Sequence, residues 1–299
     1  MKIGITGASG LIGTALSAHL AGGGHDVVAF SRGVARPGAI EWNPVAGTID
    51  RAGLAGLDAI VNLAGAGIGD RRWTDEYRRT LVDSRVVSTR LLANAMAELA
   101  GDGGPTTLIS GSAVGFYGNR DNELLTEVSR SGDDFLADLC VQWEAATDRA
   151  STAGVRVAHA RTGIVLTAKG GALKKMLPLF KLALGGRFGS GKQWMSWISL
   201  ADEVRALEYL LLNDVSGPVN LTAPNPVTNR DFTAALADAL HRPAVLPVPA
   251  FGPKLLLGAE MAESLLLFSQ RVAPDVLERS GFEFEHPDLD AALSAALSD

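Results

Sequence analysis

Three glycines near the start of the sequence have the spacing of a turn that binds phosphate. The segment Thr6-Gly7-Ala8-Ser9-Gly10-Leu11-Ile12-Gly13 follows directly on an apolar run. In such a turn the first glycine allows a tight bend, the second lets the backbone approach a pyrophosphate, and the third lets a helix pack closely on the strand. The amino end of that helix adds free N–H groups and a positive dipole end. We therefore expect a dinucleotide here rather than an ordinary glycine turn.

The second expected strand, Asp26 to Ser31, is followed by the basic residue Arg32. Proteins that prefer NAD place an acid near this point to bind the ribose 2′-hydroxyl, whereas an arginine accommodates a 2′-phosphate. Neither Ser31 nor Arg32 is acidic, so the sequence favours NADP(H). The alternative is a solvated surface arginine.

Expected strands and helices, which must position these residues, alternate through the first half of the chain. Short apolar segments are separated by helical patterns, which is typical of a parallel sheet buried on both faces. Right-handed crossovers then predict a Rossmann-type doubly wound α/β fold. The expected strands are residues 2–6, 26–31, 58–63, 107–110 and 155–160.

The second half of the chain is rich in glycine and proline, which predicts a change of architecture. We expect residues 1–168 plus about 197–223 to form the dinucleotide-binding domain. Residues from about 169–196 plus 224–299 would form a smaller C-terminal α/β substrate lobe.

The composition of the chain limits which classes of partner we expect it to bind. The chain has 299 residues and a net charge of −6, which argues against nucleic acid as the main partner. One cysteine, Cys140, excludes an internal disulfide, and no histidines have metal-ligand spacing. The apolar stretch 255–267 carries Glu260 and Glu263, so we expect no membrane span. These features predict a cytoplasmic protein that binds a small molecule, without a metal, and a homodimer is possible.

Further motifs are spread over the whole chain. Asn62-Leu63-Ala64-Gly65, the serine-rich segment 110–118 and the segment 189–202 resemble the extended short-chain dehydrogenase/reductase superfamily. Segments 72–74, 83–85 and 135–144 and the tail from Asn220 onward resemble its atypical "epimerase family" branch, whose reaction is not settled. The resemblance implies these cofactor-binding residues: Gly7, Ser9, Gly10, Leu11, Ile12, Gly13, Ser31, Arg32, Leu63, Ala64, Gly65, Ser84 and Ser110.

The chain departs from that superfamily at its catalytic residues. Members use Tyr-x-x-x-Lys, in which tyrosine is the acid/base and lysine lowers its pKa. With Glu144 as the anchor, Leu136 takes the tyrosine position and Cys140 the lysine position. Met195 replaces an arginine that grips a nucleotide diphosphate, so bidentate pairing is lost there.

Two hydroxyl residues remain as candidate proton donors. Ser112 stands at the end of an expected strand, where the alternative is a small residue that closes the strand. Tyr117 is the other candidate, and a packing role is its alternative. The candidate substrate-binding residues are Arg72, Trp73, Arg187, Lys192 and Trp194, for which salt bridging or core packing are the alternatives.

Two functions follow from these patterns. The first is an NADP(H)-dependent oxidoreductase or epimerase-like enzyme of unknown substrate, in which the cofactor supplies the hydride chemistry. The second is a catalytically silent NADPH-binding sensor or regulatory protein. A closed pocket with converging polar groups would favour the enzyme.

Overall fold

An eight-stranded sheet forms the centre of the computed structural model, which describes residues 1–33, 37–244, 247–249 and 251–298. Its strand order is β12-β8-β6-β5-β1-β2-β3-β4, and every pair is parallel except β3–β4. The strands are β1 (Lys2–Thr6), β2 (Asp26–Ser31), β3 (Ile40–Asn43), β4 (Thr48–Ile49), β5 (Ala59–Asn62), β6 (Thr107–Ala113), β8 (Arg156–Thr162) and β12 (Gly217–Leu221).

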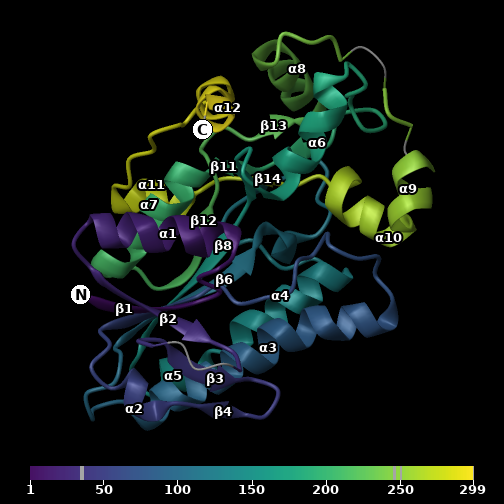
Figure 1. Cartoon of the computed structure of the whole chain (residues 1–299). Coiled ribbons are helices and arrows are strands. Elements are labelled where there is room, and N and C mark those ends of the chain that lie inside the picture. Colours follow the sequence, from purple (N-terminus) through teal and green to yellow (C-terminus); the bar gives the residue numbers. More distant parts are fainter. Residues whose placement is uncertain (34–36, 245–246, 250, 299) are drawn as a thin grey trace.

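Helices cover both faces of this sheet (Figure 1), as a doubly wound fold requires. One face packs on α1 (Leu11–Gly22) and α7 (Leu200–Leu212), through a core that includes Ile3, Ile5, Leu16 and Leu207. The other face packs on α3 and α5 through Ile60, Leu92, Leu108 and Ala150. The helices of that side are α2 (Arg51–Leu54), α3 (Asp75–Glu98), α4 (Phe135–Ala145) and α5 (Asp148–Thr152). The predicted Rossmann-type fold is confirmed.

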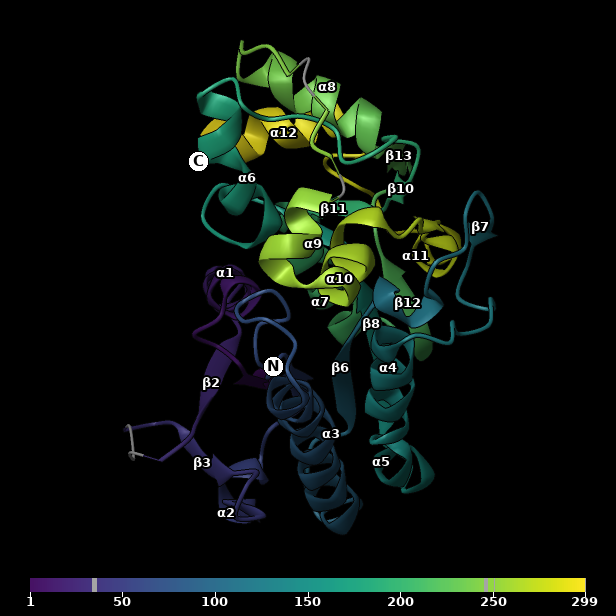
Figure 2. The same ribbon diagram turned by 90° about the vertical axis from the view of Figure 1, so that its right-hand side faces the viewer.

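A smaller lobe lies above the carboxyl ends of the strands (Figure 2). Its core joins Leu173, Leu177, Phe232, Leu236 and Leu293. The lobe is built from β9 (Ile164–Leu166), α6 (Gly171–Lys181), β10 (Trp194–Met195), β11 (Trp197–Ser199), β13 (Val227–Thr228), α8 (Asn229–Ala239) and α12 (Leu289–Ser298).

Residues 224–299 do not all belong to this lobe, although we expected them to. Leu277 and Phe282 pack with the core of the large domain. Met261 packs against Trp73, Tyr77 and Leu139, at the start of α3 and on α4. The remaining elements are η1 (Val114–Tyr117), β7 (Leu124–Leu125), α9 (Phe251–Leu257), α10 (Ala259–Ala262), the π-helical turn η2 (Glu263–Leu267), β14 (Arg271–Val272) and α11 (Asp275–Ser280).

Within the described ranges, no helix combines the length and the apolar character needed to cross a bilayer.

Candidate functional site

The glycine turn between β1 and α1 is built from close approaches that only glycine permits. Gly7 has a φ of +67°, and a Cβ there would lie 2.6 Å from the carbonyl oxygen of Leu63. A Cβ on Gly13 would lie 2.2 Å from the carbonyl oxygen of Gly7. The amide of Gly10 donates to that same Gly7 oxygen over 2.9 Å. These contacts draw α1 down onto the turn, which is the cradle a pyrophosphate needs.

The amino end of α1 has no side-chain cap. Gly10 is the N-cap residue, and no side chain accepts from the first amides of the helix within the described residues. Unsatisfied amides at a helix start bind anions. Ser9 and Gly10 are exposed, and Leu11 and Ile12 are half-buried, so this end of the helix faces outward from the core.

Thr6 joins the glycine turn to the turn that follows β5. Its hydroxyl donates to Asn62 Oδ1 over 2.6 Å and accepts from the amides of Leu63 and Ala64, both over 3.1 Å. Asn62 in turn donates to Thr89 on α3 over 2.8 Å. The two predicted cofactor turns are therefore held beside each other at the carboxyl edge of the sheet.

Arg32 lies just beyond β2 and is exposed. A cavity of about 400 Å³ begins at Gly33 and continues along β3 and β4, where Glu41 and Asp50 line it. Residues 34–36, which follow in sequence, lie outside the described part of the chain. Arg32 thus lies at the carboxyl end of β2, beside this cavity.

Arg85 is a candidate cofactor residue that the sequence did not single out. Its guanidinium donates to the carbonyl oxygens of Ala66 over 2.9 Å and Leu81 over 3.1 Å, and lies 5.1 Å from the ring centre of Trp143. A Cβ on Gly65 would lie 3.1 Å from Arg85 Cζ. Burial lowers the pKa of Arg85, and the nearby Cys140 thiol opposes that shift. A guanidinium therefore lies beside the Gly65 turn and near Cys140, the residue that the sequence predicts at the superfamily's lysine position.

Ser84 supports the same turn, because its hydroxyl accepts from the amide of Ala66 over 3.0 Å.

Ser110 is fully buried in β6, beside His159 of β8. Burial lowers the pKa of His159, so this imidazole is neutral near pH 7.

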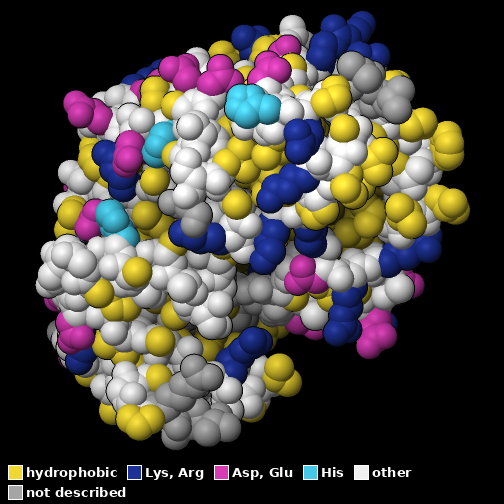
Figure 3. Space-filling view, turned by 45° about the horizontal axis from the view of Figure 1, so that its top comes forward, with side chains coloured by type: hydrophobic (Ala, Val, Ile, Leu, Met, Phe, Trp, Pro, Cys, Tyr) yellow, Lys and Arg dark blue, Asp and Glu magenta, His cyan; other side chains and the backbone are white. Residues whose placement is uncertain are grey.

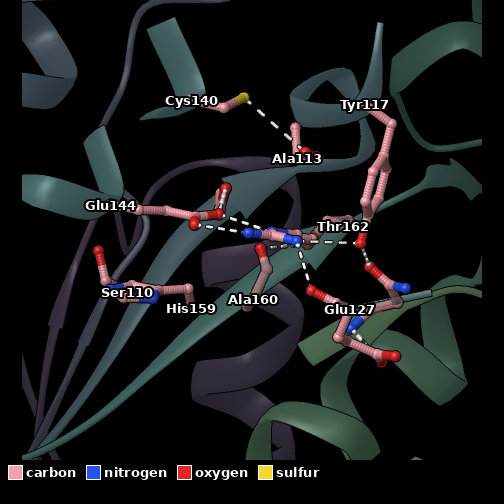
Figure 4. Close-up of polar contacts among 12 residues, drawn as sticks. Ser110, Ala113, Tyr117, Glu127, Cys140, Glu144, His159, Ala160 and Thr162 are labelled. Atoms are coloured by element: carbon pink, nitrogen blue, oxygen red, sulfur yellow. Dashed lines mark hydrogen bonds and ion pairs between the residues drawn. The ribbon is translucent and has the colours of Figure 1, made fainter. Parts of the chain in front are cut away.

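Ser112 contacts Glu144 in a buried polar network, of which Figure 4 labels Glu144 and Tyr117. Its hydroxyl donates to Glu144 Oε1 over 2.6 Å, and the carboxylate also accepts two bonds from Arg161, each of 2.8 Å. The Ser112 residue is 5% exposed. The hydroxyl proton of Ser112 is thus directed at a carboxylate beneath the strand end.

Tyr117 closes the other end of that network. Its hydroxyl donates to Asn220 Oδ1 over 2.6 Å and accepts from Arg161 over 3.0 Å. Burial raises the pKa of Tyr117 to about 12, although Arg161 opposes the shift. The side chain is fully buried and lies inside the fold, as the packing alternative expected.

The face of α4 that carries Leu136 and Cys140 packs on η1. A Cβ on Gly115 would lie 3.4 Å from Leu136 Cβ and 3.9 Å from Cys140 Sγ. The thiol lies 3.8 Å from the carbonyl oxygen of Ala113, and burial raises its pKa to about 12. The chain has three tyrosines. The two besides Tyr117 donate their hydroxyl hydrogen bonds to backbone carbonyl oxygens, Tyr77 to that of Gly67 and Tyr209 to that of Ser280.

The candidate substrate residues fall into two groups, and no described contact joins them. Trp73 is buried, donates to Ile68 O over 2.9 Å and packs on Phe135. Arg72, next to it, is exposed and lines a cavity of about 290 Å³ at the start of α3.

The second group lies on the hairpin of the small lobe. Lys192 is exposed, and Arg187 has a buried Nε without a partner in the described residues. Trp194 donates to Asn122 over 2.7 Å, and Arg271 lies 4.6 Å above its ring. No group of acidic, histidine or cysteine side chains in the described ranges has the arrangement of a metal site.

The sheet and the glycine cradle define a dinucleotide-binding α/β protein. Residues 3–222 match the NAD dependent epimerase/dehydratase family, and residues 248–296 match a domain of unknown function, DUF1731. The chain belongs to the NAD dependent epimerase/dehydratase family, and the predicted resemblance to its atypical "epimerase family" branch is confirmed.

Similar proteins come from bacteria, plants and animals. Epimerase family protein Mb2239 of Mycobacterium bovis is 46% identical over 98% of this chain and 97% of its own. The chloroplastic SDR39U1 homolog of Arabidopsis thaliana is 35% identical over 99% of this chain and 87% of its own. The crystal structure of human SDR39U1 with NADPH matches with a TM-score of 0.89 and 34% identity over 100% of both chains.

More distant structures share only the fold. The dTDP-glucose 4,6-dehydratase DesIV of Streptomyces venezuelae is 19% identical, with a TM-score of 0.76 over 100% of this chain and 96% of its own.

Proposed function

We propose that this protein is an NADP(H)-dependent oxidoreductase that acts on a small molecule without the Tyr-x-x-x-Lys relay of its superfamily. The observation that carries the proposal is the uncapped glycine cradle of α1, with Arg32 beyond β2 as the cation for a 2′-phosphate. The NADPH in the human SDR39U1 structure supports the same choice of cofactor.

In this proposal the chain's own residues bind and orient the cofactor. The amides of Leu11 and Ile12 face the pyrophosphate, Thr6 fixes the two turns, and Arg85 supplies a cation beside Gly65. When bound, NADPH supplies a hydride to a substrate carbonyl. The matching proton comes from water, because the hydroxyls of Ser112 and Tyr117 donate to Glu144 and Asn220.

The same two hydrogen bonds favour a second candidate function. A protein whose strand-end hydroxyls are held inside the fold has no side chain positioned there for acid/base chemistry. A catalytically silent NADPH-binding sensor would need the cradle, Arg32 and Arg85, and nothing more.

The experiment that separates the two functions has two steps. NADPH is first titrated into the purified protein by calorimetry, with NADH as the comparison. The complex with NADPH deuterated at C4 is then incubated with a panel of aldehydes, ketones and enones, and products are analysed by mass spectrometry. Deuterium in a product supports the oxidoreductase, binding without transfer supports the sensor, and no binding contradicts both.

A further inference from the structure

The cavity at the start of α3 is lined by two arginines that form no ion pair in the described residues. Its volume is about 290 Å³, and its walls are Arg71, Arg72, Thr74, Glu76, Tyr77 and Thr80. The guanidinium of Arg71 lies 5.9 Å from the ring centre of Tyr77.

Three other basic residues of the neighbouring segments are paired. Arg78 binds Glu260, Lys254 binds Glu263 over 2.5 Å, and Lys175 lies 3.6 Å from Asp70. The two arginines of the cavity therefore remain available to an anionic group. Glu76 is the one acidic residue among the residues that line the cavity, so the lining carries a net positive charge. Carboxylate and phosphate are the groups whose geometry a guanidinium matches.

An exposed apolar surface begins where this cavity ends. Gly258, which directly follows α9, has a φ of +93°, and a Cβ there would lie 3.1 Å from Arg72 Nε. Three side chains of α9 stand out from the surface: Phe251 is 74% exposed, Leu255 77% and Leu256 79%. Figure 3 shows hydrophobic side chains gathered at the right edge of the molecule, where α9 lies in Figure 1. Contiguous exposed apolar side chains mark binding surfaces.

We propose that this cavity and α9 together bind a single-chain anionic amphiphile, with its carboxylate or phosphate between Arg71 and Arg72 and its alkyl chain on Leu255 and Leu256. The two parts match the two halves of such a molecule, and Gly258 lies between α9 and Arg72 of the cavity. This site goes beyond the proposed function, because nothing in it requires NADPH.

Charge decides between this ligand and larger partners. A two-fold contact with a second copy would bury Arg71 and Arg72 and would have to supply carboxylates of that copy to pair with them, whereas a carboxylate or phosphate ligand brings the pairing anion itself. An anionic bilayer would meet a chain whose net charge is −6, and the nearby Arg78 and Lys254 are already paired with Glu260 and Glu263. A monomeric ligand places the negative charge of its head group in the cavity and avoids both.

The test is a titration of the cofactor-free protein with dodecanoate and dodecyl phosphate, both below their micelle concentrations. Methyl dodecanoate serves as the uncharged comparison. We expect both anions to bind and the ester to bind at least tenfold more weakly. Shortening the chain to decanoate should weaken binding by about two- to fourfold for each methylene.

Variants assign the binding to these residues. Arg71→Gln with Arg72→Gln should weaken dodecanoate binding at least tenfold, whereas the control Arg79→Gln, which changes an exposed arginine of α3 that does not line the cavity, should not. Leu255→Ser with Leu256→Ser should weaken it similarly, and the control Leu212→Ser, 55% exposed on α7, should not. Unchanged thermal midpoints show that each variant is folded.

Several results would overturn the proposal. They are equal affinity for the ester, equal loss in Arg79→Gln, adsorption only to phosphatidylglycerol vesicles, and a dimer in sedimentation that Leu255→Ser with Leu256→Ser dissolves. Loss of NADPH binding alone would contradict the proposed function and leave this site unaffected.

Discussion

Arg161 on β8 and Glu144 on α4 form two parallel charge-assisted hydrogen bonds, each 2.8 Å long, inside the large domain. Their side chains are 4% and 12% exposed. The bonds to Glu144 and Tyr117 raise the pKa of Arg161 despite the opposing effect of burial. Loss of one partner would leave the other charge buried alone, which costs about 3–5 kcal/mol.

Glu144→Gln should therefore lower the free energy of unfolding by about 3 kcal/mol or more, measured by urea denaturation. The control is Glu98→Gln, which removes the partner of Arg51 in an exposed pair and should cost less than about 1 kcal/mol. Equal effects of the two substitutions would contradict a structural role for the buried pair.

Arg32→Asp should reverse the preference between NADPH and NADH. Loss of an arginine–phosphate contact, with a like charge in its place, should weaken NADPH binding by about 2 kcal/mol, or roughly thirtyfold. Calorimetric titration of both cofactors measures this change. Arg90→Asp, an exposed arginine on α3, is the control. If the unaltered protein binds the two cofactors equally, the assignment of Arg32 is wrong.

Gly13→Ala should damage the cradle, because its Cβ would overlap the carbonyl oxygen of Gly7. We expect a loss of about 1–3 kcal/mol in stability and at least a tenfold loss in NADPH affinity. Gly22→Ala in the same helix meets no atom within 4 Å and should raise stability by about 0.5–1 kcal/mol. Fluorescence titration and thermal unfolding measure both. Normal NADPH binding by the Gly13 variant would refute the cradle.

Glu203 should make stability depend on pH between about 4.5 and 8. It is fully buried on α7, its Oε1 accepts from Thr162 over 2.9 Å, and burial raises its pKa to about 8. The folded chain therefore holds a proton that the unfolded chain releases above about pH 4.5, so stability falls as pH rises from there to 8.

Replacing Glu203 by glutamine should remove up to about 1.4 kcal/mol of slope per pH unit from the denaturation profile between pH 6 and 8. Glu98→Gln, on the surface of α3, should keep the slope. A Glu203→Gln profile parallel to that of the unaltered protein would show that Glu203 is not the titrating group.

The sequence predicted features whose cause is local. The glycine turn requires three small residues at fixed spacing beside one strand, and the apolar runs of β1, β5 and β8 needed no knowledge of distant contacts. The role of Arg85 could not be seen, since its contacts to Ala66 and Trp143 join three separate elements. The buried position of Tyr117 could not be seen either, since its hydroxyl donates to Asn220, which lies 103 residues further along the chain.

The division into domains was also hard to predict. The segment that contains α11 follows the proline-rich part of the lobe, yet Leu277 returns to the core of the large domain. The sequence of a short helix with one buried leucine does not indicate whether the helix packs on the large domain or on the small lobe, because both offer an apolar surface.

The single cysteine gives this molecule an internal reporter of local unfolding. The Cys140 thiol is 4% exposed, and burial raises its pKa to about 12, so the folded protein presents almost no reactive thiolate. A thiol reagent can modify Cys140 only when α4 separates from η1. The labelling rate therefore measures how often the contact between α4 and η1 opens. If NADPH binds against the neighbouring Gly65 turn, it should slow the labelling and make cofactor binding visible without any substrate.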